Sequence, residues 1–169
     1  MAVVETERRG QVLVVRMNRP ERLNALSHEM RTELAQAWTD FRHSKELEVA
    51  IFTGTGRGFC AGEDMKESLQ KGVAGGQRPA IEDPFMSGKL EKPVIAAING
   101  FAMGGGFMLV ERTDLRVAVR EAVFEGKTTP LVFGKPQTWV ALLIEALQVD
   151  ARGVHDVSAM PIVLVTELP

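Results

Sequence analysis

The chain has 169 residues, of which 45 % are hydrophobic and 25 % are charged, a composition that excludes disorder and fits one globular domain. Its formal net charge of -2 gives no positive field to attract nucleic acid or an anionic membrane. The single cysteine, Cys60, excludes an internal disulfide and a multi-cysteine zinc site. No secretory signal and no apolar run of about 18 residues is present, so we expect a cytoplasmic protein with no membrane or nucleic-acid partner.

In the first third of the chain, the pattern changes from strand to helix and back to strand. The β-branched run Gln11–Met17 predicts a strand that closes at the turn Asn18-Arg19-Pro20. From Leu26 to Phe41 apolar residues recur at helical spacing, and Ser27 is placed to cap the helix. A second strand is predicted over Glu48–Thr53.

The middle of the chain alternates between glycine clusters and apolar runs. A helix is expected to begin after Phe59–Lys66, followed by a loose region from Gly72 to Pro84. Pro93–Ile98 is continuously apolar, which predicts a strand covered on both faces. A helix over Phe107–Thr113 and a strand over Leu115–Val119 follow. Strands joined by crossover helices predict an α/β fold with parallel pairing.

The last third gives weaker patterns. Gln137–Leu147 is compatible with a helix, and Pro161–Thr166 with a strand.

Two segments combine a buried strand, a glycine cluster and a helix start: Ile51–Lys66 and Val94–Leu109. Glycines let a ligand approach the backbone, and a helix N-terminus presents N–H groups without intrahelical partners. Two such donors aimed at one point form an oxyanion hole. The alternative is that the glycines serve only turns and close helix–strand packing.

Three motifs then point to a known family: NRPERLNAL at 18–26, FCAGEDMK at 59–66 and KPVIAAINGFAMGGG at 92–106. In this order and spacing, and with DLRVA at 114–118, they resemble the crotonase family, also called the enoyl-CoA hydratase/isomerase family. The resemblance covers about residues 10–125. It implies a spiral of ββα units, with parallel sheets and flanking helices, that binds an acyl-CoA thioester, and a homotrimer or hexamer as the assembly.

The resemblance also implies site residues. In the family two backbone N–H groups hold the thioester oxygen, and the matching positions are Glu63 and Gly105. Coenzyme A, which arrives as part of the substrate rather than as a permanent cofactor, is expected to contact Arg22, Leu23, Ala25, Cys60, Ala61, Gly62, Asp64, Met65 and Lys66. Arg22 and Lys66 match basic groups near the phosphates, although a solvated surface would explain them equally. No metal site is expected.

The family's two catalytic glutamates are missing, because their positions hold Met108 and Thr128. Methionine exchanges no proton, and threonine is a poor base at neutral pH. Glu111, one helical turn beyond Met108, is the acid/base candidate, with a solvated helix end as its alternative. Glu63 and Glu125 are further carboxylates near the site. The alternative role of Glu63 is to cap the following helix. Glu125 takes the position of the second glutamate only if the alignment slips by three residues.

After Glu125 the family pattern stops, and we divide the chain into an acyl-CoA-binding core at 1–125 and a divergent, shortened C-terminal region at 126–169. The tail fits either a truncated relative or a specialised paralogue. Three functions stay open: an enoyl-CoA hydratase/isomerase-type enzyme of fatty acid metabolism (a lyase or isomerase), an inactive acyl-CoA-binding or interaction protein, and a chain without a function of its own.

Overall fold

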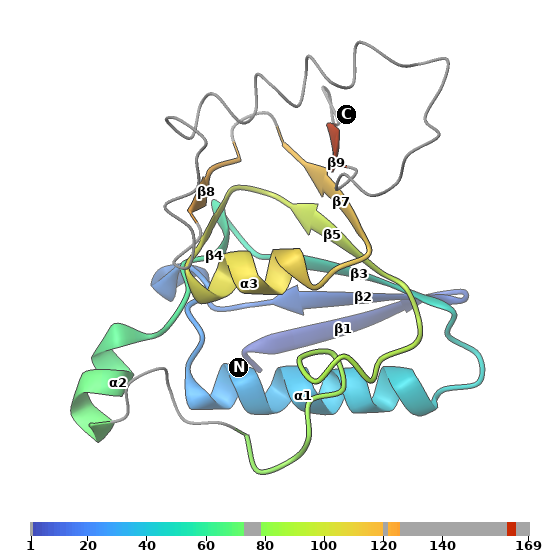
Figure 1. The fold of residues 1–169 in the computed structure, drawn as a ribbon, viewed down its shortest axis with the longest axis horizontal. Coiled ribbons are helices and arrows are strands. Elements are labelled where there is room, and N and C mark those ends of the chain that lie inside the picture. Colours follow the sequence, from blue (N-terminus) through green and yellow to red (C-terminus); the bar gives the residue numbers. More distant parts are fainter. Residues whose placement is uncertain (1, 73–78, 120–121, 126–161, 165–169) are drawn as a thin grey trace.

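The computed structural model describes residues 2–72, 79–119, 122–125 and 162–164. Two sheets organise them (Figure 1). The larger has six strands in the order β1-β2-β3-β5-β7-β9, and the smaller has three in the order β4-β6-β8. In the larger sheet β1 pairs with β2 antiparallel and every other pairing is parallel, as are both pairings of the smaller sheet. The α/β class and the parallel sheets are therefore confirmed.

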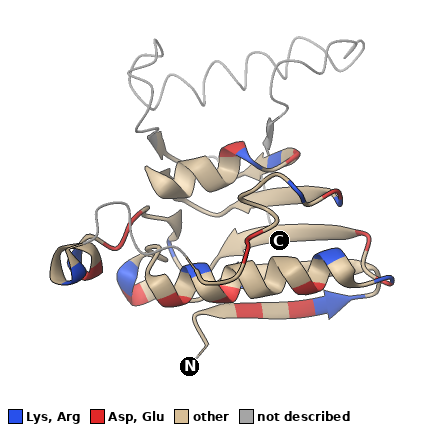
Figure 2. Cartoon of the chain, turned by 60° about the horizontal axis from the view of Figure 1, so that its bottom comes forward, with Lys and Arg blue, Asp and Glu red and all other residues tan. Residues whose placement is uncertain are grey.

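The chain begins with a hairpin, β1 (Val4–Arg9) and β2 (Val12–Met17), that turns at Gly10, where φ is +62°. β2 matches the predicted strand, whereas β1 was not predicted. Only Val4 of β1 is buried, so the strand shows no alternation to recognise. Figure 2 marks acidic and basic residues along this strand in red and blue. β1 ends the order of the larger sheet, and charges on such a strand discourage pairing with other chains.

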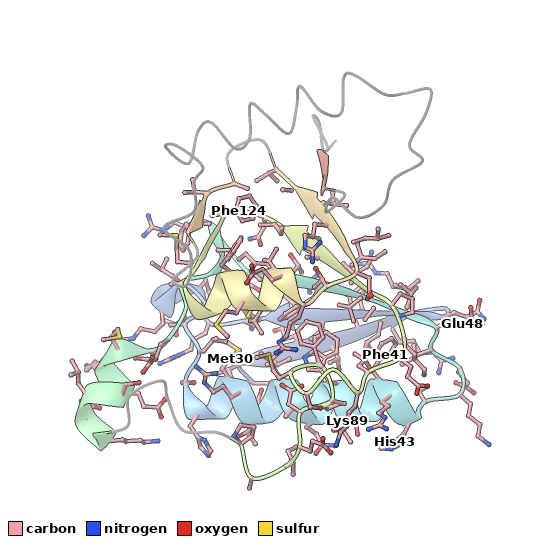
Figure 3. The ribbon with its side chains drawn as sticks, viewed as in Figure 1. Met30, Phe41, His43, Glu48, Lys89 and Phe124 are labelled. Carbon is pink, nitrogen blue, oxygen red and sulfur yellow. The ribbon has the colours of Figure 1, made fainter. Side chains whose placement is uncertain are left out.

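After the hairpin come the 3-10 turn η1 (Pro20–Arg22) and the helix α1 (His28–His43). Ser27 caps α1 as predicted, its side chain accepting a hydrogen bond from the Met30 N–H. Leu34, Trp38 and Phe41 are buried on the apolar face of the helix. Met30 and Phe41 project from α1 toward the sheet, and His43 lies at the exposed end of the helix (Figure 3).

Each following repeat gives one strand to each sheet, and this alternation is the predicted spiral of ββα units. The first repeat contains β3 (Val49–Gly54), β4 (Gly58–Cys60) and α2 (Met65–Lys71). The second contains β5 (Val94–Ile98), β6 (Phe101–Met103) and α3 (Gly105–Glu111). The third begins with β7 (Leu115–Ala118) and β8 (Phe124–Glu125). β9 (Ile162–Leu164) lies within the strand predicted at 161–166.

Two predictions need adjustment. α3 spans Gly105–Glu111 rather than 107–113, because the helix already begins inside the glycine run. β5 buries Val94, Ala96 and Ile98, but Ile95 and Ala97 on its other face are only half-buried within the described structure. The predicted helix at 137–147 lies outside the described residues.

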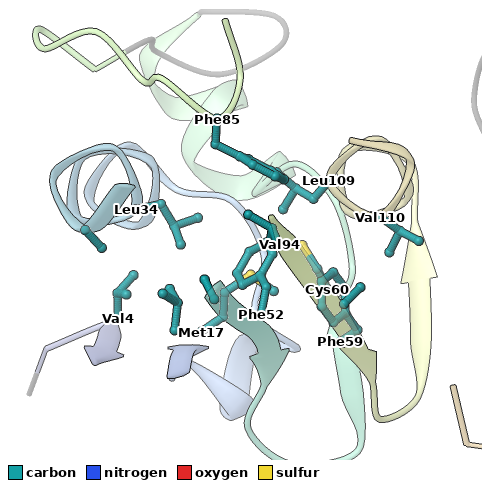
Figure 4. Packing of buried hydrophobic residues seen from close by; sticks show 14 of the residues in the cluster. Val4, Met17, Leu34, Phe52, Phe59, Cys60, Phe85, Val94, Leu109 and Val110 are labelled. Atoms are coloured by element: carbon teal, nitrogen blue, oxygen red, sulfur yellow. The ribbon is translucent and has the colours of Figure 1, made fainter. Parts of the chain in front are cut away.

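The core fills the space between the larger sheet, α1 and α3 (Figure 4). Its centre is aromatic: Trp38 meets Phe52 edge-on at 5.2 Å between ring centroids and stacks on Phe85 at 5.0 Å. Phe85 comes from the segment 79–90 and reaches the core beside Leu109 of α3. A segment with no regular secondary structure is thereby fixed over the gap between the two helices.

Candidate active site

A pocket of about 960 Å³ opens between α1, the loop before α2, the segment 79–87 and the start of α3. Six residues that the sequence singled out line it: Ala61, Gly62, Glu63, Met65, Gly105 and Met108. They come from the two glycine-rich segments, about 40 residues apart in sequence, which the fold brings together at one cavity.

The loop before α2 is held by a short parallel pairing between Leu26 and Glu63. The Leu26 N–H donates to the Gly62 carbonyl at 2.7 Å, and the Asp64 N–H donates to the Leu26 carbonyl at 3.3 Å. In such a pairing the peptide groups of the intervening residue, here Glu63, point away from the partner strand. The Glu63 N–H is therefore directed away from Leu26.

Gly62 permits the close approach of this loop to α3. A Cβ at this position would lie 2.7 Å from the Met103 carbonyl oxygen and 3.2 Å from the Gly105 nitrogen, and its φ is +91°. Both facts exclude any other residue without a backbone shift. Gly105 itself is the first residue of α3, so its N–H has no acceptor inside the helix. A Cβ on Gly105 would lie 3.8 Å from the Glu63 nitrogen. The loop before α2 and the start of α3 are therefore within van der Waals contact of each other.

Two buried side chains, Asn24 and Cys60, hold the backbone around the loop before α2 in place. The Asn24 side chain donates to the carbonyls of Thr55 and Gly58, each at 2.9 Å, and accepts from the Arg19 N–H at 2.9 Å. The Cys60 thiol donates to the Asn24 carbonyl at 3.1 Å. Burial raises the pKa of this thiol to about 12, and the Gly62 N–H and the charge of Arg31 offset the effect only in part. Cys60 is thus a structural thiol in its protonated form.

The segments predicted to contact coenzyme A lie side by side. The Ala61 N–H donates to the Leu23 carbonyl at 3.0 Å, which places residues 23–26 beside residues 61–64. Arg22 and Lys66 are both exposed, which fits groups that meet phosphates and a solvated surface equally. Ala25 and Asp64 are buried. Asp64 caps α2 by accepting from the Glu67 N–H at 3.1 Å.

The acid/base candidates are placed differently. Met108 lines the pocket and is 42 % exposed, so the position of the family's first glutamate does face the cavity. Glu111 ends α3 on an exposed position and is not among the residues that line the pocket. Its carbonyl accepts from the Arg116 guanidinium at 2.7 Å. Thr128 lies outside the described residues, and for Glu125 the structure describes only the backbone.

Among the described residues, two pocket carboxylates were missed by the sequence reasoning, Glu82 and Asp83. Asp83 lines the cavity from the segment 79–87, which the sequence predicted only as part of a loose region. Its Oδ1 accepts from the Phe85 N–H at 2.9 Å and the Met86 N–H at 3.0 Å. The signal was present in Asp-Pro-Phe, since an aspartate before such a turn commonly accepts from the backbone ahead of it.

Within the described ranges, no three histidine, cysteine or carboxylate side chains gather as a metal site would require. No helix in those ranges is long and apolar enough to cross a membrane.

Comparison with known proteins decides the family. The sequence model described as enoyl-CoA hydratase/isomerase matches residues 7–152, most of the chain. The chain belongs to the enoyl-CoA hydratase/isomerase family. The match continues past the boundary that the sequence placed at residue 125, and the division into two regions stays a prediction.

Individual members of the family are similar to this chain in sequence. The chain is 41 % identical over 136 residues to enoyl-CoA hydratase EchA19 of Mycobacterium tuberculosis, covering 73 % of this chain and 51 % of that protein. It is 33 % identical over 174 residues to (E)-benzylidenesuccinyl-CoA hydratase of Thauera aromatica, covering 98 % of this chain and 63 % of the relative.

The fold is likewise that of the family. A crystal structure of an enoyl-CoA hydratase from Mycobacterium tuberculosis H37Rv has a TM-score of 0.65 and 33 % identity, over 73 % of this chain and 48 % of the other. The chain spans about half the length of the enoyl-CoA hydratases that it matches.

Proposed function

We propose that the chain binds an acyl-CoA thioester in this pocket and stabilises the enolate of the bound thioester with the N–H groups of Glu63 and Gly105. The observation that carries the proposal is that both residues line one cavity, with their backbone segments held in contact by Gly62 and by the Leu26 pairing. An oxygen that gains negative charge between two such donors is stabilised more than the neutral thioester.

The same geometry supports a place for the coenzyme A part of the ligand. The segments 22–25 and 61–66 lie beside each other next to the pocket, with Arg22 and Lys66 exposed. We assign these two cations to the phosphates, as the resemblance suggests. The acyl chain then occupies the side of the cavity made by Leu26, Leu34 and Leu109, where apolar side chains suit a hydrocarbon.

The reaction class is that of the relatives, which include the short-chain-enoyl-CoA hydratase of Clostridium acetobutylicum. Hydration of an enoyl-CoA and movement of its double bond both pass through an enolate at the thioester. The pocket supports an enzyme of this type, a lyase or isomerase acting in fatty acid metabolism.

Calorimetric titration of the full chain with crotonyl-CoA tests the proposal, with loss of enoyl absorbance followed in the same mixtures. We expect saturable binding and turnover, and weaker binding of free coenzyme A, which lacks the thioester carbonyl. Failure of crotonyl-CoA to bind would refute the proposal. Binding without turnover would leave the ligand assignment in place and remove the enzymatic one.

A further inference from the structure

Among the residues that the structure describes, three carboxylates line the pocket: Glu63, Glu82 and Asp83. Glu82 is exposed and pairs with Lys89 at 2.6 Å, a contact that directs its carboxylate to the surface. Asp83 is half-buried and has no ion pair with a described residue. Of the two neighbours on this segment, Asp83 is therefore the one placed to act inside the cavity.

The position of Asp83 is fixed by the turn that follows it. Pro84 and Phe85 are buried, and the N–H groups of Lys89 and Leu90 donate to the Pro84 carbonyl at 2.9 and 3.0 Å. Phe85 stacks on the fully buried Trp38. The aromatic core holds the residue two positions ahead, which fixes the backbone of Asp83, and the hydrogen bonds from the Phe85 and Met86 N–H groups hold its carboxylate.

The two oxygens of this carboxylate differ. Oδ1 takes both backbone hydrogen bonds, whereas Oδ2 accepts none from any residue that the structure describes. An immobilised carboxylate with one unused oxygen at a cavity has the geometry of a proton acceptor.

The electrostatic surroundings favour the same role. Burial raises the pKa of Asp83, while the Met86 and Phe85 N–H groups and the charge of Arg112, the residue after α3, oppose the rise. Within the described ranges, the other charged groups at the pocket are Arg31 of α1, Glu63 of the loop before α2 and Glu82. A carboxylate with a raised pKa is a stronger base once it is ionised.

We propose that Asp83 removes and returns the α-proton of the bound thioester, in the absence of a glutamate at Met108. In this step Oδ2 accepts the proton from the α-carbon, and the electron pair of the C–H bond moves to the thioester oxygen, forming the enolate. Return of a proton from Asp83 to the α-carbon restores the thioester. The inference rests on the proposed function, because the enolate oxygen is held by the Glu63 and Gly105 N–H groups.

The test is exchange of the α-protons of butyryl-CoA in heavy water, followed by NMR on the full chain, with calorimetric binding measured for every variant. Asp83→Asn keeps an oxygen for the two backbone N–H groups but removes the base. We expect exchange to fall at least about 100-fold with the dissociation constant within about threefold of the unaltered chain. Glu82→Gln removes the neighbouring carboxylate and is expected to exchange normally.

Should Asp83→Asn fold poorly, Asp83→Ser offers a second neutral acceptor for the same N–H groups. A pH profile separates a chemical role of Asp83 from a structural one. In the unaltered chain and in Glu82→Gln, the exchange rate should rise with pH to a plateau. The midpoint of this rise should lie above the ordinary pKa of an aspartate. Neutral variants that bind butyryl-CoA and exchange at the normal rate would overturn the inference but leave the proposed function. Binding without any exchange in the unaltered chain would also overturn it, and no binding would overturn both.

Discussion

The Arg19 guanidinium donates to the Asp64 carboxylate at 2.7 Å and ties the turn after β2 to the N-terminus of α2. Burial alone would raise the pKa of Asp64. The hydrogen bonds from Arg19 and the Glu67 N–H, with the charges of Arg19 and Arg22, outweigh burial and hold the pKa below its ordinary value. This pair fixes the loop from which Glu63 faces the pocket.

Replacement of this arginine should destabilise the fold. Arg19→Met keeps the aliphatic length but leaves the carboxylate of Asp64, 9 % exposed, without its partner. We expect the free energy of unfolding in urea to fall by about 2 kcal/mol. Arg9→Gln, which breaks the fully exposed pair with Glu7, is the control and should change little. Equal effects of the two substitutions would contradict the structural role of the pair.

The same pair predicts a pH dependence. A carboxyl group whose pKa is lower in the folded chain contributes stability above its unfolded value, and that stability is lost as the pH falls through the folded value. The contribution of Asp64 should therefore be complete above about pH 4 and disappear in more acidic solution. Urea unfolding between pH 6 and pH 3 should show the stability gap between the unaltered chain and Arg19→Met closing as the pH falls.

Asn24 is expected to be one of the least replaceable residues. It is fully buried, has φ of +55°, and forms three hydrogen bonds through its side chain. Asn24→Ala should cost about 3 kcal/mol, at roughly 1 kcal/mol for each bond lost. Asn18→Ala removes an exposed hydrogen bond to Glu5 and should cost less than about 1 kcal/mol. Chemical unfolding of the two variants checks the difference.

Cys60 should resist thiol reagents while the chain is folded. With a pKa of about 12 and a fully buried side chain, it is protonated and inaccessible at neutral pH. Labelling with iodoacetamide should be slow in buffer and rapid in concentrated urea. Because the thiol ionises more readily in the unfolded chain, stability should also fall as the pH rises from about 9 toward 12. Rapid labelling without denaturant would show that the loop opens.

The donor role of Gly105 can be separated from its small size. Proline is tolerated at the first position of a helix, so Gly105→Pro deletes the N–H without breaking α3. Gly105→Ala adds the Cβ, 3.1 Å from Leu26 Cδ1, but keeps the N–H. The rate of α-proton exchange should be about 100- to 1000-fold lower in the proline variant than in the alanine variant. Equal rates in the two variants would exclude this N–H as a donor.

Sequence patterns were sufficient to predict a helix or strand where that element buries a continuous apolar face. α1 and β3 carry enough apolar residues at regular spacing to be recognised alone. β4 and β6 were missed because each has three residues, and their pairing with each other depends on the packing of Gly58 against Phe101. No local pattern encodes a contact of that kind.

The candidate site was also predictable from the sequence only in part. The motifs around Glu63 and Gly105 pointed to the two segments, and the structure shows that both line one pocket. Asp83 could not be placed from the sequence, because its position depends on Phe85 packing against Trp38, 47 residues earlier in the chain. Glu111 was chosen by its spacing along a helix, but the turn of α3 directs it to the surface.

We infer that a thioester carbonyl in the pocket is polarised between the Glu63 and Gly105 N–H groups. The most direct measurement is the infrared difference spectrum of butyryl-CoA, labelled with ¹³C at the thioester carbonyl, bound to the full chain. We expect the carbonyl band to shift to lower wavenumber on binding and to return toward the free position in Gly105→Pro. A band that stays at its free position when the ligand is saturating would show that these N–H groups do not polarise the carbonyl.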